Sequence, residues 1–402
     1  MFIKQDSQQV EIKDKSMLKL LFLAAAGFLS LLSEAIPAGM LFDIGSDLGI
    51  TTAMAGQFIT LYAAGCFFSA IPLSYATRNM QRRTLLSFIL AGSALFNLLT
   101  ALFSDYHLIL IVRFLSGMTG GLLWATLSGY ARSMVSREKK GRAVTIAYAG
   151  IPLALALGIP VGVFVSELIG WRSVFYAISV LTVIMTLFTP KLMPAVSMPQ
   201  KNTSSLLSGI TVLLANPSVR AVLIINFVWA MAHNMLYIYV LPILENIGLG
   251  TQASILLMNF GISSVFGVFI TGLFIDRNLP RIVIICLTLF LLSTLIILIS
   301  KSSIFIVSIA VMAWGTAYGG ASAVLPAASA EASEQDVDLA QSLLSTTYNL
   351  AFTIAGIAGG LALSELNASG LSLMIFFMAL MTFSLAALFK HRGLLARASR
   401  ID

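Results

Sequence analysis

The chain has 402 residues, of which 58% are hydrophobic and only 10% are charged. Soluble domains carry about 25% charged residues, so this composition excludes a soluble protein and indicates an integral membrane protein. The net charge is +7 at pH 7. The basic residues lie in short loops at the ends of apolar stretches, where anionic lipid head groups account for them, and we therefore expect no nucleic-acid partner.

Twelve apolar stretches follow one another along the chain. Each has about the 20 residues that a helix needs to cross the hydrocarbon core of a bilayer. We therefore predict an all-α integral membrane protein with twelve transmembrane helices. The expected spans are Leu18–Phe42, Ala53–Ala76, Leu85–Phe103, Leu108–Ala131, Ala143–Val165, Val174–Met193, Val219–Leu244, Ala253–Ile275, Ile282–Ser300, Ile304–Pro326, Leu339–Leu363 and Leu371–Phe389.

Positive charge falls almost entirely on one side of these spans. Of the 24 Lys and Arg residues, 21 lie before the first span, in every second connection or after the last span. Only Arg172 and Lys301 lie in the opposite connections, and Arg113 lies inside the fourth span. By the positive-inside rule, both termini are cytoplasmic. No cleavable leader is expected, because Glu34 interrupts the first apolar run.

The longest cytoplasmic connection, residues 194–218, separates six spans from six. We predict one bundle over residues 1–193, a linker, and a second bundle over residues 219–402. Leucines and Ile210 recur at helical spacing within the linker, which predicts a short helix on the inner membrane surface. Six plus six helices joined in this way is the layout of transporters built from repeats, whose solute sites lie near the midplane where the halves meet.

Glu34 is the one acidic residue that cannot be placed in a loop, a tail or a helix end. It lies roughly 12 Å inside the first span, and Arg113 lies about 10 Å inside the fourth span from the same outer side. A carboxylate at that depth is costly unless it is paired, hydrated or protonated. Glu34 therefore either joins helices through hydrogen bonds or carries protons. Arg113 either pairs with Glu34, directly or through water, or bonds backbone carbonyls.

The second half also carries polar and aromatic residues at a depth suited to a solute cavity. A lone histidine such as His233 is more often a packing residue than a proton relay. The amide, hydroxyl and imidazole groups could nevertheless bind a polar solute, and tryptophans could form its apolar walls. The candidate lining residues are His233, Asn234, Tyr237, Asn226, Asn259, Asn349, Trp124 and Trp314.

Glycines and a proline mark the fifth span at Gly150, Gly158, Pro160 and Gly162. Glycines allow helices to approach closely, and proline removes a backbone hydrogen bond and softens the helix. The sequence contains no metal-ligand spacing, nucleophile elbow, phosphate loop or ATP-binding motif. We therefore expect no enzymatic activity, no metal and no cofactor, so that an ion or solute gradient supplies the energy.

With these residues identified, the chain resembles the major facilitator superfamily, and within it the twelve-helix drug:proton antiporters that include sugar, nucleoside and drug exporters. Arg113 to Gly117 (RFLSG) is similar to a fourth-helix motif whose arginine is implicated in proton transfer. Gly158 to Gly162 (GIPVG) is similar to the fifth-helix antiporter motif that marks exporters. Gly170 to Arg172, with Phe175, resembles the start of the sixth helix, and Glu34 to Gly39 (EAIPAG) resembles a first-helix segment whose acidic residue couples protons.

The chain departs from the family in the loop between the second and third helices. The family motif has a Gly, an Asp and basic residues there, and this chain keeps only Arg78, Arg82 and Arg83. The loop after the eighth span retains the motif better, as Gly272 to Arg277 (GLFIDR). The resemblance therefore implies a cytoplasmic gate formed by Gly272, Asp276, Arg277, Arg82 and Arg83, held mainly by the second half.

Together these observations predict a monomeric, proton-coupled exporter of a small drug-, sugar- or nucleoside-like solute, located in a bacterial inner membrane and working by alternating access. Protons and the solute would be its partners besides the lipid bilayer. Two alternatives stay open: a facilitator or importer of sugars or nucleosides, and a membrane receptor or scaffold that has lost transport.

Overall fold

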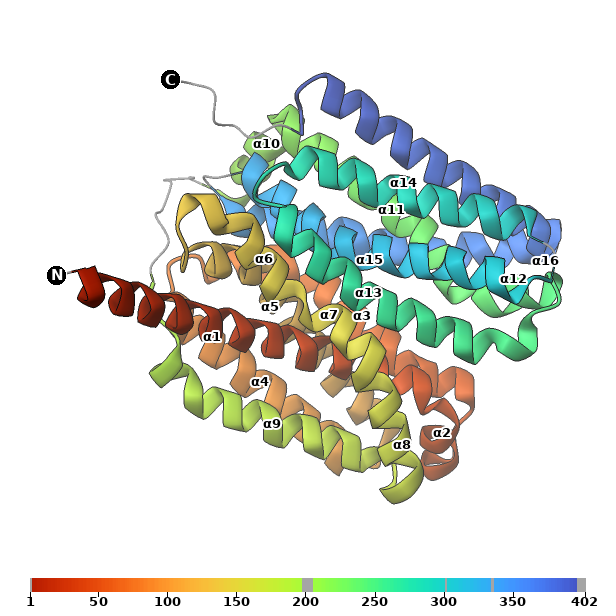
Figure 1. The fold of residues 1–402 in the computed structure, drawn as a ribbon. Coiled ribbons are helices and arrows are strands. Elements are labelled where there is room, and N and C mark those ends of the chain that lie inside the picture. Colours follow the sequence, from red (N-terminus) through yellow and green to blue (C-terminus); the bar gives the residue numbers. More distant parts are fainter. Residues whose placement is uncertain (1, 197–204, 301, 334–335, 396–402) are drawn as a thin grey trace. The chain divides into compact units, whose positions relative to one another are not determined.

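The computed structural model describes residues 2–196, 205–300, 302–333 and 336–395, with backbone alone for residues 2–15 and 52–53. These ranges form helices and contain no β-strand (Figure 1). Eleven of the helices in them are long and apolar enough to cross a membrane. The longest, α16 (Val337–His391), is two helices joined at a kink, so the structure holds twelve spans. The predicted all-α, twelve-span architecture is confirmed.

The kink in α16 lies at Asn367. Its backbone has φ 59° and ψ −177°, in the positive-φ region that asparagine adopts more readily than most residues. The Asn367 Oδ1 accepts hydrogen bonds from the backbone N–H groups of Ser369, at 2.9 Å, and Gly370, at 3.2 Å. These are the unpaired donors of a new helix, so one side chain ends the eleventh span and caps the twelfth.

The chain forms two compact units, Met1–Gln200 and Lys201–Asp402. Their boundary lies within the predicted linker, of which residues 197–204 lie outside the described residues. The linker helix α10 (Leu206–Ala215) begins where the Ser205 hydroxyl accepts a hydrogen bond from the Ser208 N–H at 3.1 Å. Leu207 and Val212 on this helix are exposed. An outward apolar face of this kind suits a helix lying on a membrane surface.

The first unit contains six spans. Its helices are α1 (Phe2–Ala35), α2 (Leu41–Leu48), α3 (Thr52–Ala76), α4 (Arg82–Leu102), α5 (Tyr106–Arg132), α6 (Lys140–Tyr148), α7 (Gly150–Leu153), α8 (Ile159–Ile169) and α9 (Trp171–Leu192). Helix α3 packs along α5, and α4 packs along α9. The short helices α6, α7 and α8, with a π-helical turn between α7 and α8, together form the fifth span.

The second unit also contains six spans. Its helices after α10 are α11 (Pro217–Ile238), α12 (Val240–Asn246), α13 (Ala253–Phe274), α14 (Leu279–Ile299), α15 (Ile304–Ala332) and α16. Helix α11 packs along α16, and α15 packs against both α13 and α14. The two cysteines, Cys66 in α3 and Cys286 in α14, are buried and free.

Several spans differ from their predicted bounds, and three of them show where the chain breaks or continues unexpectedly. The first, expected as one helix over Leu18–Phe42, ends at Ala35 and continues as a 3₁₀ turn and α2. The seventh, expected over Val219–Leu244, breaks at Tyr239 between α11 and α12. The tenth was expected to end at Pro326, but α15 continues to Ala332. Interior prolines are tolerated in membrane helices because neighbouring groups satisfy the freed backbone.

The glycines of the fifth span lie against α1. A Cβ added at Gly150 would overlap the backbone of Ala24 and Phe28, and one at Gly158 or Gly162 would overlap the side chain of Phe28 or Ile36. The π-helical turn, Ala154–Gly158, directly precedes Pro160, which cannot donate a backbone hydrogen bond. The predicted antiporter residues therefore form a close, locally distorted contact with the broken first helix.

A second glycine contact recurs in both units. In the first unit, Gly117 of α5 faces the backbone carbonyl of Tyr62 in α3 so closely that a Cβ would overlap the oxygen. In the second unit, Gly319 of α15 faces the carbonyl of Ser264 in α13 in the same way. Glycine is required at these positions because the two backbones touch.

We expect Gly117→Ala to lower the free energy of unfolding by about 1–3 kcal/mol, because the added methyl group would push α5 away from α3. Gly56→Ala on α3 is the control, since no atom lies within 4 Å of a Cβ added there. Denaturant unfolding in detergent micelles measures both. Equal stability of the two variants would contradict the close contact.

Candidate functional site

The break in α1 leaves one backbone carbonyl without its helical partner. In a continuous helix, the carbonyl of Ser33 would accept from the N–H of residue 37. That residue is Pro37, which has no N–H, and α1 ends at Ala35. Glu34 lies beside this free acceptor. The sequence Ser33-Glu34-Ala-Ile-Pro37 thus places a carboxyl group and an unpaired carbonyl at one point in the membrane.

Arg113 of α5 supplies the missing donor. Its Nη2 donates to the Ser33 carbonyl at 2.8 Å, its Nη1 to the Ser33 hydroxyl at 3.4 Å, and its Nε to the Phe58 carbonyl of α3 at 3.2 Å. The side chain is fully buried. Its guanidinium carbon lies 4.9 Å from the centre of the Tyr62 ring and 5.4 Å from that of Phe175. One cation therefore joins α1, α3 and α5 and is solvated by carbonyls and aromatic faces.

The hydrogen bonds continue from Ser33 into α4. The Ser33 hydroxyl donates to the Asn97 Oδ1 at 2.7 Å, and the Asn97 amide donates to the Ser93 carbonyl at 2.8 Å. Ser33 and Asn97 are buried. The sequence analysis did not select either residue. Asn97, a polar residue within the third span, and the four-residue spacing of Ser33 from Pro37 were the available signals.

Glu34 itself is only partly buried. It forms no ion pair with Arg113, whose donors go to Ser33 and Phe58 instead. The two charges nevertheless interact through the electrostatic field. Of the two roles expected for Arg113, the structure shows the bonding of backbone carbonyls. Direct pairing with Glu34 is absent from this conformation.

A second polar cluster fixes the short helix α2. The Asp43 carboxylate accepts from the Ser166 hydroxyl of α8 at 2.8 Å. The Asp47 carboxylate accepts from the indole N–H of Trp171 at 3.1 Å and forms an ion pair with Arg172, both in α9. These aspartates follow the break in α1, so the segment after Glu34 is attached to the fifth and sixth spans. From the sequence, both aspartates fit a loop or a helix end and give no sign of these contacts.

An aromatic cluster surrounds His233 in the second unit. The imidazole stacks on Trp229 and Tyr318, with ring centres 5.4 Å and 4.4 Å apart. The indole N–H of Trp314 donates to the His233 Nδ1 at 3.0 Å. An indole N–H can only donate, so Nδ1 holds a lone pair and the ring is the neutral Nε2–H tautomer. Tyr237, one turn further along α11, forms the exposed end of the cluster.

The predicted asparagines do not join this cluster through their side chains. Asn226 donates to the Leu344 carbonyl of α16 at 3.1 Å, whereas Asn234 donates to the Ala230 carbonyl of its own helix at 2.7 Å. Asn349 donates to the Ser345 carbonyl within α16 at 2.9 Å. Asn259 is partly exposed, and its backbone carbonyl accepts a hydrogen bond from the Ser263 hydroxyl at 2.7 Å. Asn226 thus joins two helices, whereas Asn234 and Asn349 each donate to a backbone carbonyl one turn earlier in their own helix.

Trp124 lies in the first unit, where its ring centre is 5.8 Å from that of Tyr148. A Cβ added at Gly27 would touch the Trp124 ring, so this residue packs against α1.

The residues expected at a cytoplasmic gate differ in burial. Arg82 is buried, and its backbone N–H donates to the Val196 carbonyl at 2.9 Å. Arg83 donates to the Pro190 carbonyl at 3.3 Å. In the second unit, Gly272 and Asp276 are partly buried and Arg277 is exposed. In the described part of the chain, no three His, Cys, Asp or Glu side chains gather as a metal site requires.

With the fold and these sites established, comparison with known proteins identifies the family. The sequence matches the Major Facilitator Superfamily over residues 23–331 and 236–397. The chain belongs to the Major Facilitator Superfamily. One relative, the "Probable sugar efflux transporter" of Helicobacter pylori (strain P12), is 23% identical over 354 residues, which cover 88% of this chain and 90% of the relative.

Solved structures of this superfamily share the fold. The transporter FucP in the outward conformation has a TM-score of 0.76 at 13% identity, covering 93% of this chain and 99% of FucP. The proton:xylose symporter XylE has a TM-score of 0.73 at 12% identity, covering 95% and 96%. The human organic anion transporter MFSD10 has a TM-score of 0.70 at 14% identity, covering 93% and 98%. The protein is therefore a multi-pass membrane transporter of a small molecule and not an enzyme.

The hydrogen bonds of Arg113 predict a specific rescue. Arg113→Gln should lower the free energy of unfolding by about 2–3 kcal/mol, because it removes charge-assisted hydrogen bonds to buried carbonyls. Pro37→Ala returns an N–H that can serve the Ser33 carbonyl. We expect Pro37→Ala to restore part of the stability lost in Arg113→Gln, as measured by denaturant unfolding of both single variants and the double variant. Strictly additive losses would show that the freed carbonyl is not what Arg113 satisfies.

The indole donor to His233 can be tested by comparing two tryptophans of the same cluster. Trp314→Phe removes the donor to Nδ1, whereas Trp229→Phe removes a ring that only stacks on the imidazole. Both changes remove a similar volume. We expect Trp314→Phe to be less stable than Trp229→Phe by about 1–3 kcal/mol, the cost of an unsatisfied buried acceptor. Equal unfolding free energies would contradict the hydrogen bond.

Proposed function

We propose that this transporter exports a small organic solute and that protons entering through Glu34 drive the export. The observation that carries the proposal is the position of Glu34. This partly buried carboxyl group lies at the break in α1, next to the Ser33 carbonyl that holds Arg113. Intramembrane carboxyl groups at such positions serve as proton relays in transporters.

Proton binding would act through the electrostatic coupling of Glu34 to Arg113. When Glu34 is charged, its field favours a guanidinium that stays near the end of α1. When Glu34 is neutral, Arg113 is held only by its hydrogen bonds to Ser33 and Phe58. The proton therefore changes the free energy of one arrangement of α1, α3 and α5 relative to another. A ligand that discriminates between two conformations in this way shifts their populations.

Proton coupling is assigned to Glu34 rather than to His233. The His233 Nδ1 is already occupied by the Trp314 N–H, and aromatic rings surround the imidazole. A second proton on this ring would break the hydrogen bond and place a charge in a buried site. We therefore assign the aromatic cluster to solute binding, with Tyr237 as its accessible end.

Sugars are the first class of solute to test. The Helicobacter relative is named a probable sugar efflux transporter. Aromatic walls with a few polar groups, as around His233 and Tyr237, are typical of sites for small molecules with apolar and polar faces. The close contact of α1 with Gly150, Gly158 and Gly162 supports export, because these residues form the segment that resembles the antiporter motif.

We place the protein in the inner membrane of a bacterium, with its basic connections in the cytoplasm. The bacterial relative and the distribution of 21 of 24 Lys and Arg residues to one side support this location. We propose that it works as a monomer by alternating access and uses the proton gradient without a bound cofactor.

Glu34→Gln tests the proposal, because it keeps the hydrogen-bonding shape of the side chain and removes its titration. Inverted vesicles that contain the purified protein would receive an imposed pH difference, acidic inside, and a panel of labelled sugars. We expect wild type to accumulate a sugar against its gradient, and Glu34→Gln to lose uphill transport while keeping exchange down the gradient. Glu245→Gln, an exposed carboxyl group of α12, is the matched control and should transport like wild type.

Three results would overturn the proposal. Uphill accumulation that survives Glu34→Gln would remove this residue as the proton carrier. Accumulation in the same direction as the proton flow would identify an importer. If no tested solute is transported and proton movement does not change when a solute is added, the protein would be a receptor or scaffold.

A further inference from the structure

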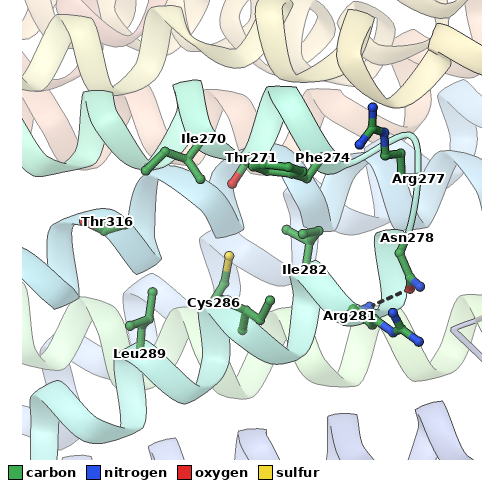
Figure 2. Close-up of a pocket in the computed structure, with 12 residues that line it drawn as sticks. Ile270, Thr271, Phe274, Arg277, Asn278, Arg281, Ile282, Cys286, Leu289 and Thr316 are labelled. Atoms are coloured by element: carbon green, nitrogen blue, oxygen red, sulfur yellow. Dashed lines mark hydrogen bonds between the residues drawn. The ribbon is translucent and has the colours of Figure 1, made fainter.

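A groove separates α13 and α14 in the second unit, and its lining does not include His233 or Tyr237. It has a volume of about 400 Å³, and α15 forms its floor (Figure 2). Helices α13 and α14 each pack along α15 and touch one another little, which explains why a gap remains between them. The groove is lined mainly by apolar side chains, among them Ile270, Phe274, Ile282, Ile285 and Leu289.

One end of the groove is positively charged. Arg277 and Arg281 lie at the end formed by the loop between the helices, whereas Leu289 and Thr316 lie at the other end (Figure 2). The Asn278 Oδ1 accepts from the Arg281 N–H at 3.2 Å and thereby caps α14. Both arginines are exposed. Asp276 supplies the one carboxyl group of this loop, which leaves it with a net positive charge.

The positive end lies at the cytoplasmic surface by the charge pattern of the whole chain. The rest of the groove then extends into the hydrocarbon region. From Arg281 to Leu289, eight residues of helix advance about 12 Å, close to the roughly 15 Å thickness of one leaflet's hydrocarbon. Phe274 and Ile285 expose 46% and 52% of their surface along this length. Water would not fill so apolar a groove, but an acyl chain would.

We propose that this groove binds an anionic phospholipid of the cytoplasmic leaflet, with its phosphate on Arg277 and Arg281 and one acyl chain between α13 and α14. The groove matches such a lipid in two respects: its positive end suits the phosphate, and its apolar length suits an acyl chain. Basic pockets between membrane helices on the cytoplasmic side recognise anionic head groups. The lipid would fill the gap between two helices that touch one another little.

Native mass spectrometry of the purified, full-length protein in detergent tests the binding. Phosphatidylglycerol would be titrated against phosphatidylethanolamine of the same acyl chains. We expect tighter binding of phosphatidylglycerol, and a loss of at least about fivefold in its affinity in the double variant Arg277→Gln/Arg281→Gln, because each surface cation contributes appreciably to anionic lipid binding. Lys390→Gln/Arg392→Gln removes two exposed cations from the cytoplasmic end of α16 and should leave the affinity unchanged.

A second pair of variants tests the acyl chain. Leu289→Trp would fill the apolar end of the groove and keep both arginines, so it should also weaken phosphatidylglycerol binding. Leu292→Trp lies on the same helix at an exposed position outside the groove and should bind like wild type. Wild-type affinity in Leu289→Trp, equal binding of the two lipids, or complete competition by inorganic phosphate would each overturn the proposal. The last result would identify an anion site without a lipid chain. Circular dichroism confirms that each variant is folded.

Discussion

The contact between α1, α3 and α5 in the first unit depends on the hydrogen bond that Arg113 donates to the Ser33 carbonyl. Pro37 removes the donor that this carbonyl would have in a helix, and Arg113 replaces it across 80 residues of chain at 2.8 Å. The replacement requires a buried cation, and the cation in turn requires the Phe58 carbonyl and the aromatic faces around it. Glu34 is important in this arrangement because it directly follows Ser33, whose carbonyl accepts from Arg113 in place of the missing helical N–H.

The two units share their packing and differ in their polar chemistry. Gly117 against Tyr62 and Gly319 against Ser264 form the same backbone contact between equivalent pairs of helices. Both first helices also break near the outer end, at Ala35 and at Tyr239. The first unit places the buried Arg113 at its break, whereas the described residues of the second unit place the aromatic cluster around His233 before theirs. The proposed proton site and the proposed solute site therefore lie in different units of the same architecture.

The spans were predictable because the length of an apolar stretch and the charges that flank it can be read from the local sequence. The interruptions of the spans are harder to predict. The sequence predicts a helix end at Pro326, yet α15 continues through it, and it predicts a continuous first span, yet α1 ends before Pro37. In the candidate site, sequence reasoning placed Glu34 and Arg113 at similar depth. It could not show that Arg113 bonds carbonyls, since those acceptors come from helices far apart in the chain. The tautomer of His233 likewise depends on Trp314, 81 residues away.

The short helix α2 connects the break in α1 to other helices of the first unit. Its eight residues advance about 12 Å, and Asp43 and Asp47 attach it to α8 and α9. Arg172, which pairs with Asp47, also donates to the Phe103 carbonyl at the end of α4. Because α2 is held at Asp43 and Asp47, a movement of the chain at Gly39 and Met40 would not stay local. It would be passed through these contacts to α8, to α9 and to the end of α4.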